Sequence, residues 1–286
     1  MPIRALVTGG SGFIGSYLSN LLMRQGASVH VLDIAPPQFS GAQYHAHDVG
    51  DTEWVTKLPQ VDVVYHLAAV SRMDDALRSP SATYATNCTG TRNALEFALR
   101  CKAPFVYAST SCCYDELTLT PYHHTKWLGE QICAYYAEHA GMSVGIARLF
   151  NVYGRHAHFT GAPKLVMEVF EQRMREGLPL PLIADGGQKR DFIHVQDVCE
   201  ALIAIAALRS RAEIFDIGTG RYHAVRELVE WFGAKAQQVP ARSYDVQERH
   251  ADVAATEQRL GWHAKIDLRG YIADAVKNLA PARRAQ

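Results

Sequence analysis

Two side chains four residues apart, Tyr122 and Lys126, could together carry out acid-base chemistry. They fall in a helical pattern that begins with Pro121, where a missing N–H does no harm, and continues to His139. Residues at this spacing lie on one face of a helix, about one turn apart. An ammonium group beside a phenol favours the phenolate and lowers a pKa that is otherwise about 10. Tyr122 is therefore predicted to serve as a base near neutral pH.

Hydroxyl side chains precede this helix, at the end of a predicted strand over residues 104–108. Ser109, Thr110 and Ser111 follow that strand directly, so a parallel sheet would place them at its ligand-binding edge. A Tyr and a Lys at this spacing also arise by chance, as a solvated Lys beside a half-buried Tyr. We favour a catalytic set because a nucleotide-binding pattern precedes it in the chain.

That pattern is a glycine-rich turn near the amino terminus. An apolar run over residues 3–8 leads into the turn, and residues 16–25 follow with apolar positions at helical spacing. Gly10, Gly12 and Gly15 satisfy G-x-G-x-x-G, while Gly9, Gly12 and Gly15 satisfy G-x-x-G-x-x-G. The turn must be tight, its backbone must approach a pyrophosphate, and its last glycine must let the helix pack on the strand. The stretch predicts a dinucleotide site.

An acidic residue after the second strand indicates which dinucleotide binds. The strand predicted over residues 28–32 ends at Asp33, roughly 20 residues after the glycines, where a carboxylate can accept from a ribose 2′-OH. No Arg or Lys lies between Asp33 and Tyr44 to neutralise a 2′-phosphate. NAD is therefore favoured over NADP, and the alternative is a plain βαβ unit with an exposed Asp.

The remaining elements alternate in the order expected of an α/β protein. Strands followed by helices up to about residue 150 predict a doubly wound parallel sheet (Rossmann type) with right-handed crossovers. The chain is thus divided into an NAD-binding domain, 1–150, and a smaller carboxyl-terminal α/β substrate lobe, 151–286, from which segments near 190–220 return to the sheet. The tail from Ala280 to Gln286 is expected to fray. The other predicted strands are 43–46, 61–65, 142–149, 180–184 and 213–217, and the other predicted helices are 79–100, one within 161–177, and 196–208.

Composition excludes several classes of function. Lys+Arg and Asp+Glu both number 29 in the 286 residues, and no basic run offers an electrostatic surface for nucleic acid or an anionic membrane. No apolar run reaches the ~18 residues of a membrane span, and the chain starts with a strand, so a cytoplasmic protein is expected. The six cysteines are scattered without a C-x-x-C pair, which indicates reduced thiols and no metal site.

Ordered motifs along nearly the whole chain make it resemble an extended short-chain dehydrogenase/reductase of the NAD-dependent epimerase/dehydratase family, which acts on nucleotide sugars. Besides the glycine turn and the Ser/Thr-Tyr-Lys set, the matching segments are Asp48-Val49, His66-Leu67-Ala68-Ala69, Asn87 with Gly90-Thr91, Arg148 to Gly154, Arg190 to Val195 with Asp197, Arg249 to Asp252, and Leu260-Gly261-Trp262.

The resemblance implies a role for each matched residue. Tyr122 would take the sugar hydroxyl proton, Lys126 would hold the nicotinamide ribose, and Thr110, or its neighbour Ser111, would be the catalytic Ser/Thr. Two phosphates that bind a protein without net charge also require guanidinium donors close by. Arg190 and Arg249 could supply them, and the alternative is that either arginine forms only a surface ion pair. The expected contacts to the nucleotide sugar are Asn151, Arg190, Arg249 and Asp252. The expected contacts to NAD are Gly9, Gly12, Phe13, Ile14, Gly15, Asp33, Asp48, Val49, Leu67, Ala68, Ala69, Asn87, Tyr122 and Lys126.

The residues after Thr110 bear on the reaction. Family dehydratases carry Asp-Glu there, whereas this chain has Ser111-Cys112, and the Glu that assists the related decarboxylases is also absent. Hydride chemistry alone remains, which predicts a 4-epimerase that regenerates NAD in each cycle. The alternatives are a 4-dehydrogenase or 4-ketoreductase that releases its product and, least favoured, a non-catalytic nucleotide sensor.

Two departures from the family concern the sugar pocket. The segment between Thr110 and Tyr122 is short, and Cys112 stands where the GDP-mannose 3,5-epimerases place a catalytic cysteine. A thiolate could remove a proton from carbon beside a 4-ketone, with Lys164 a loose candidate as its partner, but we favour Cys112 and Cys113 as small packing residues.

The other polar residues of this short segment are expected to have lesser roles. Asp115 and Glu116 are taken as loop charges, and His123 and His124 as bystanders on a helix surface. The resemblance further implies a homodimer that packs through helices including the one that bears Tyr122.

Overall fold

The centre of the protein is one parallel sheet. The computed structural model describes residues 2–155, 165–241, 246 and 248–279. Seven strands pair in the order β11-β6-β5-β4-β1-β2-β3, and all six pairings are parallel, which confirms the predicted doubly wound α/β fold. Their bounds in that order are Arg211–Ile217, Val144–Leu149, Phe105–Thr110, Val63–His66, Arg4–Thr8, Ser28–Asp33 and Gln43–Ala46.

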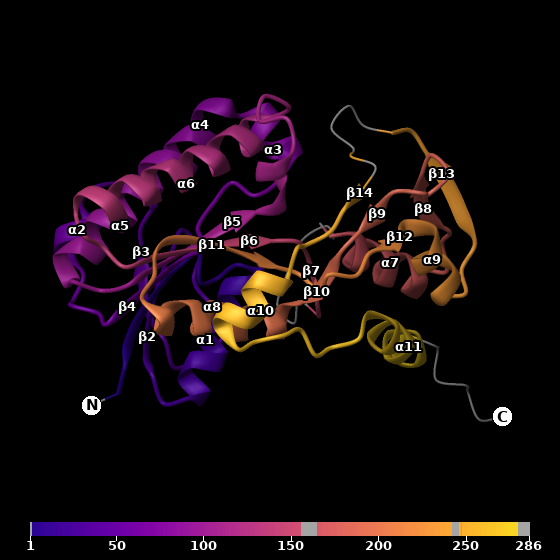
Figure 1. Cartoon of the computed structure of the whole chain (residues 1–286). Coiled ribbons are helices and arrows are strands. Elements are labelled where there is room, and N and C mark those ends of the chain that lie inside the picture. Colours follow the sequence, from indigo (N-terminus) through magenta and orange to yellow (C-terminus); the bar gives the residue numbers. More distant parts are fainter. Residues whose placement is uncertain (1, 156–164, 242–245, 247, 280–286) are drawn as a thin grey trace.

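Helices cover both faces of the sheet (Figure 1). The helices α1 (Phe13–Arg24) and α8 (Val195–Leu208) pack on one face through one apolar core cluster. The helices α2 (Trp54–Lys57), α5 (Gly90–Cys101) and α6 (Pro121–His139) pack on the other face through a second cluster. Strands buried on both faces must be apolar throughout, which explains the continuous β-branched runs of the sequence.

The helix predicted over residues 79–100 is present but is not regular. After α3 (Met73–Arg78), the chain forms α4 (Pro80–Tyr84), a π-helical turn over Ala85–Thr89, and α5. Such π turns inside helices are frequent at functional sites. This one carries Asn87, which is only 1% exposed.

The carboxyl-terminal half builds a separate apolar cluster from both sides of residue 200. Helices α7, α9 and α11 and the strand β8 supply much of it. The strand β13 pairs in parallel with β8, and these elements lie together at the right of Figure 1. Part of the helix predicted within 161–177 and the tail 280–286 fall outside the described residues. The bounds are Val166–Arg175, Val225–Trp231 and Leu268–Leu279 for the helices, and Leu180–Ile183 and Ala236–Val239 for the strands.

Short strands connect this half to the central sheet. The strands β7 (Asn151–Tyr153) and β10 (Phe192–His194) are parallel partners. The strand β9 (Lys189–Arg190) lies between β12 (His223–Ala224) and β14 (Glu248–Arg249), and α10 (Ala254–Leu260) packs on α8 and β11. Among the described helices, none has both the length and the apolar character that crossing a membrane requires.

Replacement of Gly15 by Ala should destabilise this fold at its amino-terminal turn. A Cβ there would lie 2.1 Å from the carbonyl oxygen of Gly9 and 2.7 Å from the Cα of Gly10, and backbone atoms cannot rotate away. We expect the free energy of unfolding, measured by urea denaturation, to fall by about 1–3 kcal/mol. Gly270→Ala in α11 is the control, because its nearest contact would be an ordinary 3.4 Å. Equal stability of the two variants would contradict this packing account.

Candidate active site

The glycine turn between β1 and α1 has the geometry of an anion-binding site. Gly9 has φ +69° and lies so close to the loop after β4 that a Cβ would be 2.7 Å from the amide nitrogen of Ala68. No side chain caps the helix at Gly12, and its first turn contains no acidic residue. Uncapped N–H groups at the positive end of a 12-residue helix suit a diphosphate. The turn therefore fits the predicted dinucleotide.

Asp33 lies beside this turn, as its place after β2 requires. Its carboxylate accepts from the backbone N–H of Ser11 at 3.0 Å and of Ala35 at 3.1 Å. Two of the expected NAD contacts differ in exposure: Asp48 is exposed, whereas Val49 is buried in the core and packs against Gly90. Only Asp48 thus presents its side chain at the surface of this edge.

Asn87 ties three elements together. Its amide oxygen accepts from the N–H of Val70, and its amide nitrogen donates to the Val70 carbonyl and to the Thr125 hydroxyl at 2.9 Å. Both amide protons are therefore engaged within the protein. The side chain holds the segment after Leu67-Ala68-Ala69 against α6, which makes it a positioning residue in this structure.

The predicted catalytic hydroxyls lie at the carboxyl end of β5. Thr110 is the last residue of that strand, and its hydroxyl accepts from the N–H of Cys112 at 3.2 Å. Burial raises the pKa of Tyr122 above its ordinary value, and the nearby Thr110 hydroxyl, which favours the phenolate, offsets this only in part. Ser111 begins the following 3₁₀ turn, Ser111–Tyr114. The structure thus brings Tyr122 and Thr110 together.

Lys126 is held against β5. It is 4% exposed, its ammonium donates to the Ala108 carbonyl at 2.7 Å, and it lies 4.8 Å from the centre of the Tyr107 ring. Burial lowers the pKa of Lys126 to about 8. The expectation of a lowered Tyr122 pKa is therefore wrong for this structure, in which the effect of burial on the phenol exceeds that of its neighbours.

Four polar side chains form a buried cluster beside Tyr122: Cys112, Asp115, His123 and Arg249. Arg249 donates to the Cys112 sulfur at 3.4 Å and forms an ion pair with the Asp115 carboxylate. His123 Nε2 faces the same carboxylate at 3.4 Å. The side chain of Asp115 is 8% exposed and that of His123 is 0% exposed. The predictions that Asp115 is a loop charge and that His123 lies on a helix surface are therefore wrong.

The charges of this cluster shift the pKa values of its members. Burial alone would raise the pKa of Cys112, but His123 and Arg249 outweigh it and lower that pKa below the ordinary value. Burial alone would lower the pKa of His123, but Asp115 and Cys112 raise it to about 9. The cluster therefore favours a thiolate beside an imidazolium. Lys164, the partner considered for Cys112 from the sequence, lies outside the described residues.

A second ion pair that the sequence does not predict lies under the hydroxyl strand. Glu130 accepts from Arg148 at 2.9 and 2.7 Å and also contacts the Ser109 hydroxyl. The guanidinium of Arg148 stacks over the Tyr114 ring at 4.4 Å, and the Tyr114 hydroxyl donates to Asp216 at 2.8 Å. This network joins α6, β6 and β11 beneath the site.

The residues predicted to bind the nucleotide sugar lie on the short connecting strands and the loop after β14. Asn151 donates to the Asp191 carbonyl at 2.9 Å, and the N–H of Asp252 donates to Asp216 at 3.2 Å. Arg190 and Arg249 are register partners in the parallel pair β9 and β14. The two arginines therefore come from neighbouring strands, although Arg249 is already paired with Asp115.

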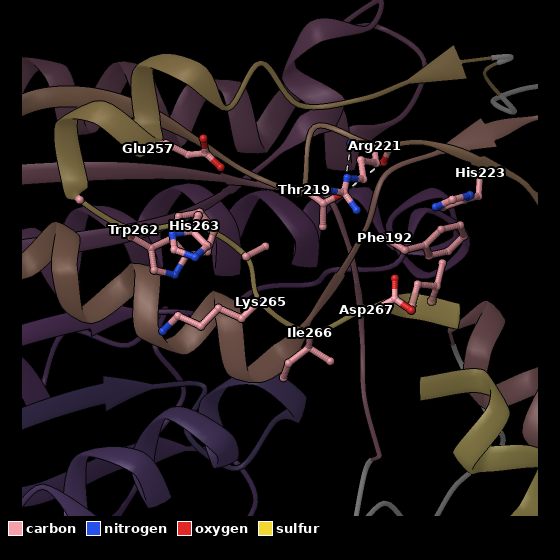
Figure 2. A pocket seen from close by; sticks show the side chains of 13 residues that line it. Phe192, Thr219, Arg221, His223, Glu257, Trp262, His263, Lys265, Ile266 and Asp267 are labelled. Carbon is pink, nitrogen blue, oxygen red and sulfur yellow. Dashed lines mark hydrogen bonds between the residues drawn. The ribbon is translucent and has the colours of Figure 1, made fainter. Parts of the chain in front are cut away.

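A cavity of about 770 Å³ lies between the loop after β11 and the segment that joins α10 to α11. Figure 2 shows Trp262 and His263 side by side on one wall, with Thr219 and Arg221 on another. None of the predicted catalytic, cofactor or substrate residues lines it.

The family follows from comparison with known proteins. The model of the NAD dependent epimerase/dehydratase family matches residues 5–218, so the chain belongs to this family. UDP-glucuronic acid decarboxylase 1 of Danio rerio is 27% identical over 93% of this chain and 70% of its own length. A putative UDP-glucose 4-epimerase of Methanocaldococcus jannaschii is 30% identical over 92% of this chain and 94% of its own length.

A solved structure is similar to this chain over nearly its whole length. MoeE5 in complex with UDP-glucose and NAD matches with a TM-score of 0.86 and 29% identity, and the match covers 96% of this chain and 97% of that chain. The predicted family and the NAD cofactor are confirmed. The protein is thus an enzyme of a family whose members include nucleotide-sugar epimerases and decarboxylases.

The buried cluster predicts an unusual titration. His123 should titrate with a pKa of about 9, above the ordinary 6.5, which imidazole ¹⁵N chemical shifts can measure. Since the folded pKa is raised, the stabilisation that protonated His123 contributes is complete below pH 6.5 and is lost as pH rises to about 9. Asp115→Asn should return the pKa toward the ordinary value. A pKa below 7 for wild-type His123 would contradict the assigned charges.

Proposed function

We propose that this protein is an NAD-dependent nucleotide-sugar epimerase that inverts carbon 4 through a transient 4-keto sugar. The observation that carries the proposal is the juxtaposition of Tyr122 with the Thr110 hydroxyl. Thr110 ends β5, and only β4, which leads to Ala68, lies between β5 and the strand β1 that leads into the glycine turn. A phenol and a hydroxyl at that edge can hold one sugar hydroxyl between them.

In the proposed reaction Tyr122 takes the proton of the C4 hydroxyl while a hydride leaves C4, so that a 4-ketone forms. Bound NAD would supply the reversible acceptor of this hydride. The 4-keto sugar would turn over in the pocket, so that its opposite face takes the hydride back. Tyr122 then gives its proton back to the C4 oxygen. The Thr110 hydroxyl orients that oxygen, and Lys126, held by the Ala108 carbonyl at 2.7 Å, is proposed to hold the nicotinamide ribose.

The side chain at position 112 favours epimerisation over dehydration or decarboxylation. A thiol stands at Cys112, where elimination or decarboxylation in the related enzymes uses a carboxylate. Asp115 is a nearby carboxylate, but the Arg249 guanidinium and His123 engage it. The relatives include both decarboxylases and a putative 4-epimerase, so sequence similarity does not decide between these reactions.

Product analysis separates the candidate reactions. The purified protein would be incubated with UDP-glucose, UDP-glucuronic acid, and GDP- and CDP-sugars without added NAD, while NADH absorbance is followed and the products are separated. An epimeric nucleotide sugar with no net NADH supports the proposal. Net NADH formation would indicate a 4-dehydrogenase, and carbon dioxide release from UDP-glucuronic acid would indicate a decarboxylase; either result contradicts it.

Tyr122→Phe should abolish most of this activity. We expect turnover to fall by about 10²–10⁴-fold, because no other group would take the hydroxyl proton, while the amount of NAD bound stays unchanged. Tyr222→Phe is the matched control, since Tyr222 is 40% exposed and is not among the predicted site residues, and its turnover should equal that of wild type. Full activity in Tyr122→Phe would contradict the role of Tyr122 as the base, and absence of turnover in both proteins would favour the interpretation of the chain as a non-catalytic nucleotide sensor.

A second candidate, epimerisation at carbon 3 or 5, is favoured by one observation. Cys112 lies between His123 and Arg249, which lower the pKa of its thiol, and a thiolate could remove a proton from carbon beside the 4-ketone. Both reactions require Tyr122, but only this one requires Cys112. Loss of product in Cys112→Ser, but not in Cys113→Ser, would favour the second candidate over the first.

We also propose that residues 151–286 form mainly the nucleotide-sugar lobe and residues 1–150 the NAD domain. Asn151, Arg190, Arg249 and Asp252 would meet the nucleotide diphosphate. For Arg249 this requires the phosphate to replace the Asp115 carboxylate, and both are anionic partners that suit a guanidinium.

The outer face of α5 and α6 supports a further proposal, that the protein is a homodimer. A groove of about 510 Å³ there is lined by Leu128, Ile132, Tyr135 and Tyr136, among other residues. A second copy of the chain could cover this groove by twofold symmetry.

Ile132→Glu should break this dimer, because it would bury a carboxylate without a partner. Sedimentation velocity should show a dimer for wild type and a monomer for the variant. Ile214→Glu is the control, since Ile214 is 43% exposed on the edge strand β11, outside the groove. A wild-type monomer, or a dimer that Ile132→Glu leaves intact, would contradict the proposed interface.

A further inference from the structure

Cys112, Asp115 and His123 place three different metal-binding groups around one point. The Cys112 sulfur, an Asp115 oxygen and a His123 ring nitrogen all lie within 4.8 Å of one another. All three side chains are buried or nearly so. The spacing of the cysteines predicts no metal site, but it carries no information on a site that combines one thiol with a carboxylate and an imidazole.

The local backbone holds these groups in place. Cys112 belongs to the 3₁₀ turn Ser111–Tyr114, and Asp115 follows at its carboxyl end. In a 3₁₀ turn the side chains at i and i+3 eclipse each other, so the thiol and the carboxylate point the same way. His123 comes from the first turn of α6, which Thr120 caps.

Thr120 also orients the imidazole. Its hydroxyl lies 2.7 Å from His123 Nδ1 and accepts from the backbone N–H of His123 at 3.4 Å. With Nδ1 fixed in this way, the other ring nitrogen is left to face the thiol and the carboxylate. Metal-binding histidines are characteristically fixed through the nitrogen that does not bind the metal.

His123 Nε2 is an unpartnered polar atom aimed into this cluster. The side chain is 0% exposed, and Nε2 has no hydrogen-bond partner among the described residues. Its 3.4 Å separation from the Asp115 oxygen is an ion-pair contact without hydrogen-bond geometry. A buried nitrogen in this state needs a partner, and a metal ion would supply one.

We propose that Cys112, Asp115 and His123 form a binding site for a thiophilic divalent cation, of which Zn²⁺ is the type. Sulfur, imidazole nitrogen and carboxylate oxygen are the three donor types that Zn²⁺ takes in proteins. The His123 imidazolium gives its proton to solvent, so that Nε2 and the Cys112 thiolate can each form a bond to the metal. A thiolate and a carboxylate balance the two positive charges, and three protein ligands leave a fourth position for water or a sugar oxygen.

Arg249 is the competitor for this site. Its guanidinium donates to the Cys112 sulfur at 3.4 Å and pairs with Asp115, so it neutralises the same two anionic groups that the metal requires. The metal and the guanidinium are therefore alternatives. Metal binding would turn Arg249 away, and loss of the guanidinium would favour the metal.

Cobalt titration tests this proposal without any substrate, independently of the proposed reaction. The full chain, freed of metal, would be titrated with Co²⁺. A thiolate-to-cobalt charge-transfer band should appear together with the strong visible bands of tetrahedral cobalt, saturate at one ion per chain, and disappear when Zn²⁺ is added. Absence of the charge-transfer band in the wild-type protein would overturn the proposal.

Variants identify the ligands. Cys112→Ser should abolish the band, and His123→Gln should weaken Co²⁺ affinity by at least about 10–100-fold. Cys113→Ser is the matched control, because that thiol faces Ser109, and its titration should match wild type. Circular dichroism would verify that each variant is folded. A band that persists in Cys112→Ser, or is lost in Cys113→Ser, would contradict the assignment.

Arg249→Gln tests the competition. We expect this variant to bind Co²⁺ more tightly than wild type, because the competing cation is gone while the three ligands remain. Weaker binding would show that Arg249 supports the site instead, and it would overturn the proposed exchange.

Discussion

The site depends on one constraint, that parallel strands end at a common edge. Strands β1, β4 and β5 are neighbours in the sheet, so the glycine turn after β1, Ala68 after β4 and Thr110 at the end of β5 share that edge. Gly9 approaches the Ala68 amide so closely that no side chain could stand between them. The close approach of these two loops keeps the cofactor turn and the catalytic hydroxyl near each other.

Helix α6 supplies the other half of the chemistry, and three kinds of contact fix it. Thr120 caps its first turn, Thr125 receives a hydrogen bond from Asn87 of the π turn, and Glu130 pairs with Arg148 of β6. The contacts with Asn87 and Arg148 join α6 to two other elements and restrict its sliding and rotation. This anchoring fixes the positions of Tyr122 and His123 at the start of the helix. The buried polar groups further along α6 therefore act on the site through the position of the helix.

The sequence predicts the architecture well, because strong local patterns determine it. Apolar runs buried on both faces predict the sheet, and the glycine spacing predicts the turn. The cluster of Cys112, Asp115 and His123 was not foreseen, because a 3₁₀ turn and a helix cap create it. Its fourth member, Arg249, lies 134 residues from Asp115 in the chain, and only the completed fold reveals their pairing. The raised pKa of Tyr122 was missed for the same reason, since burial is a property of the whole fold.

The central claim is that inversion occurs at carbon 4 by hydride transfer alone, and turnover in deuterium oxide tests it most directly. Hydride that leaves and returns to the same carbon never exchanges with solvent. The account therefore predicts a nucleotide sugar inverted at carbon 4 with no deuterium bound to carbon, as read by mass spectrometry and proton NMR. Deuterium at carbon 3 or carbon 5 would contradict it, because only removal of a proton from carbon, as proposed for Cys112 in the second candidate reaction, could introduce deuterium there.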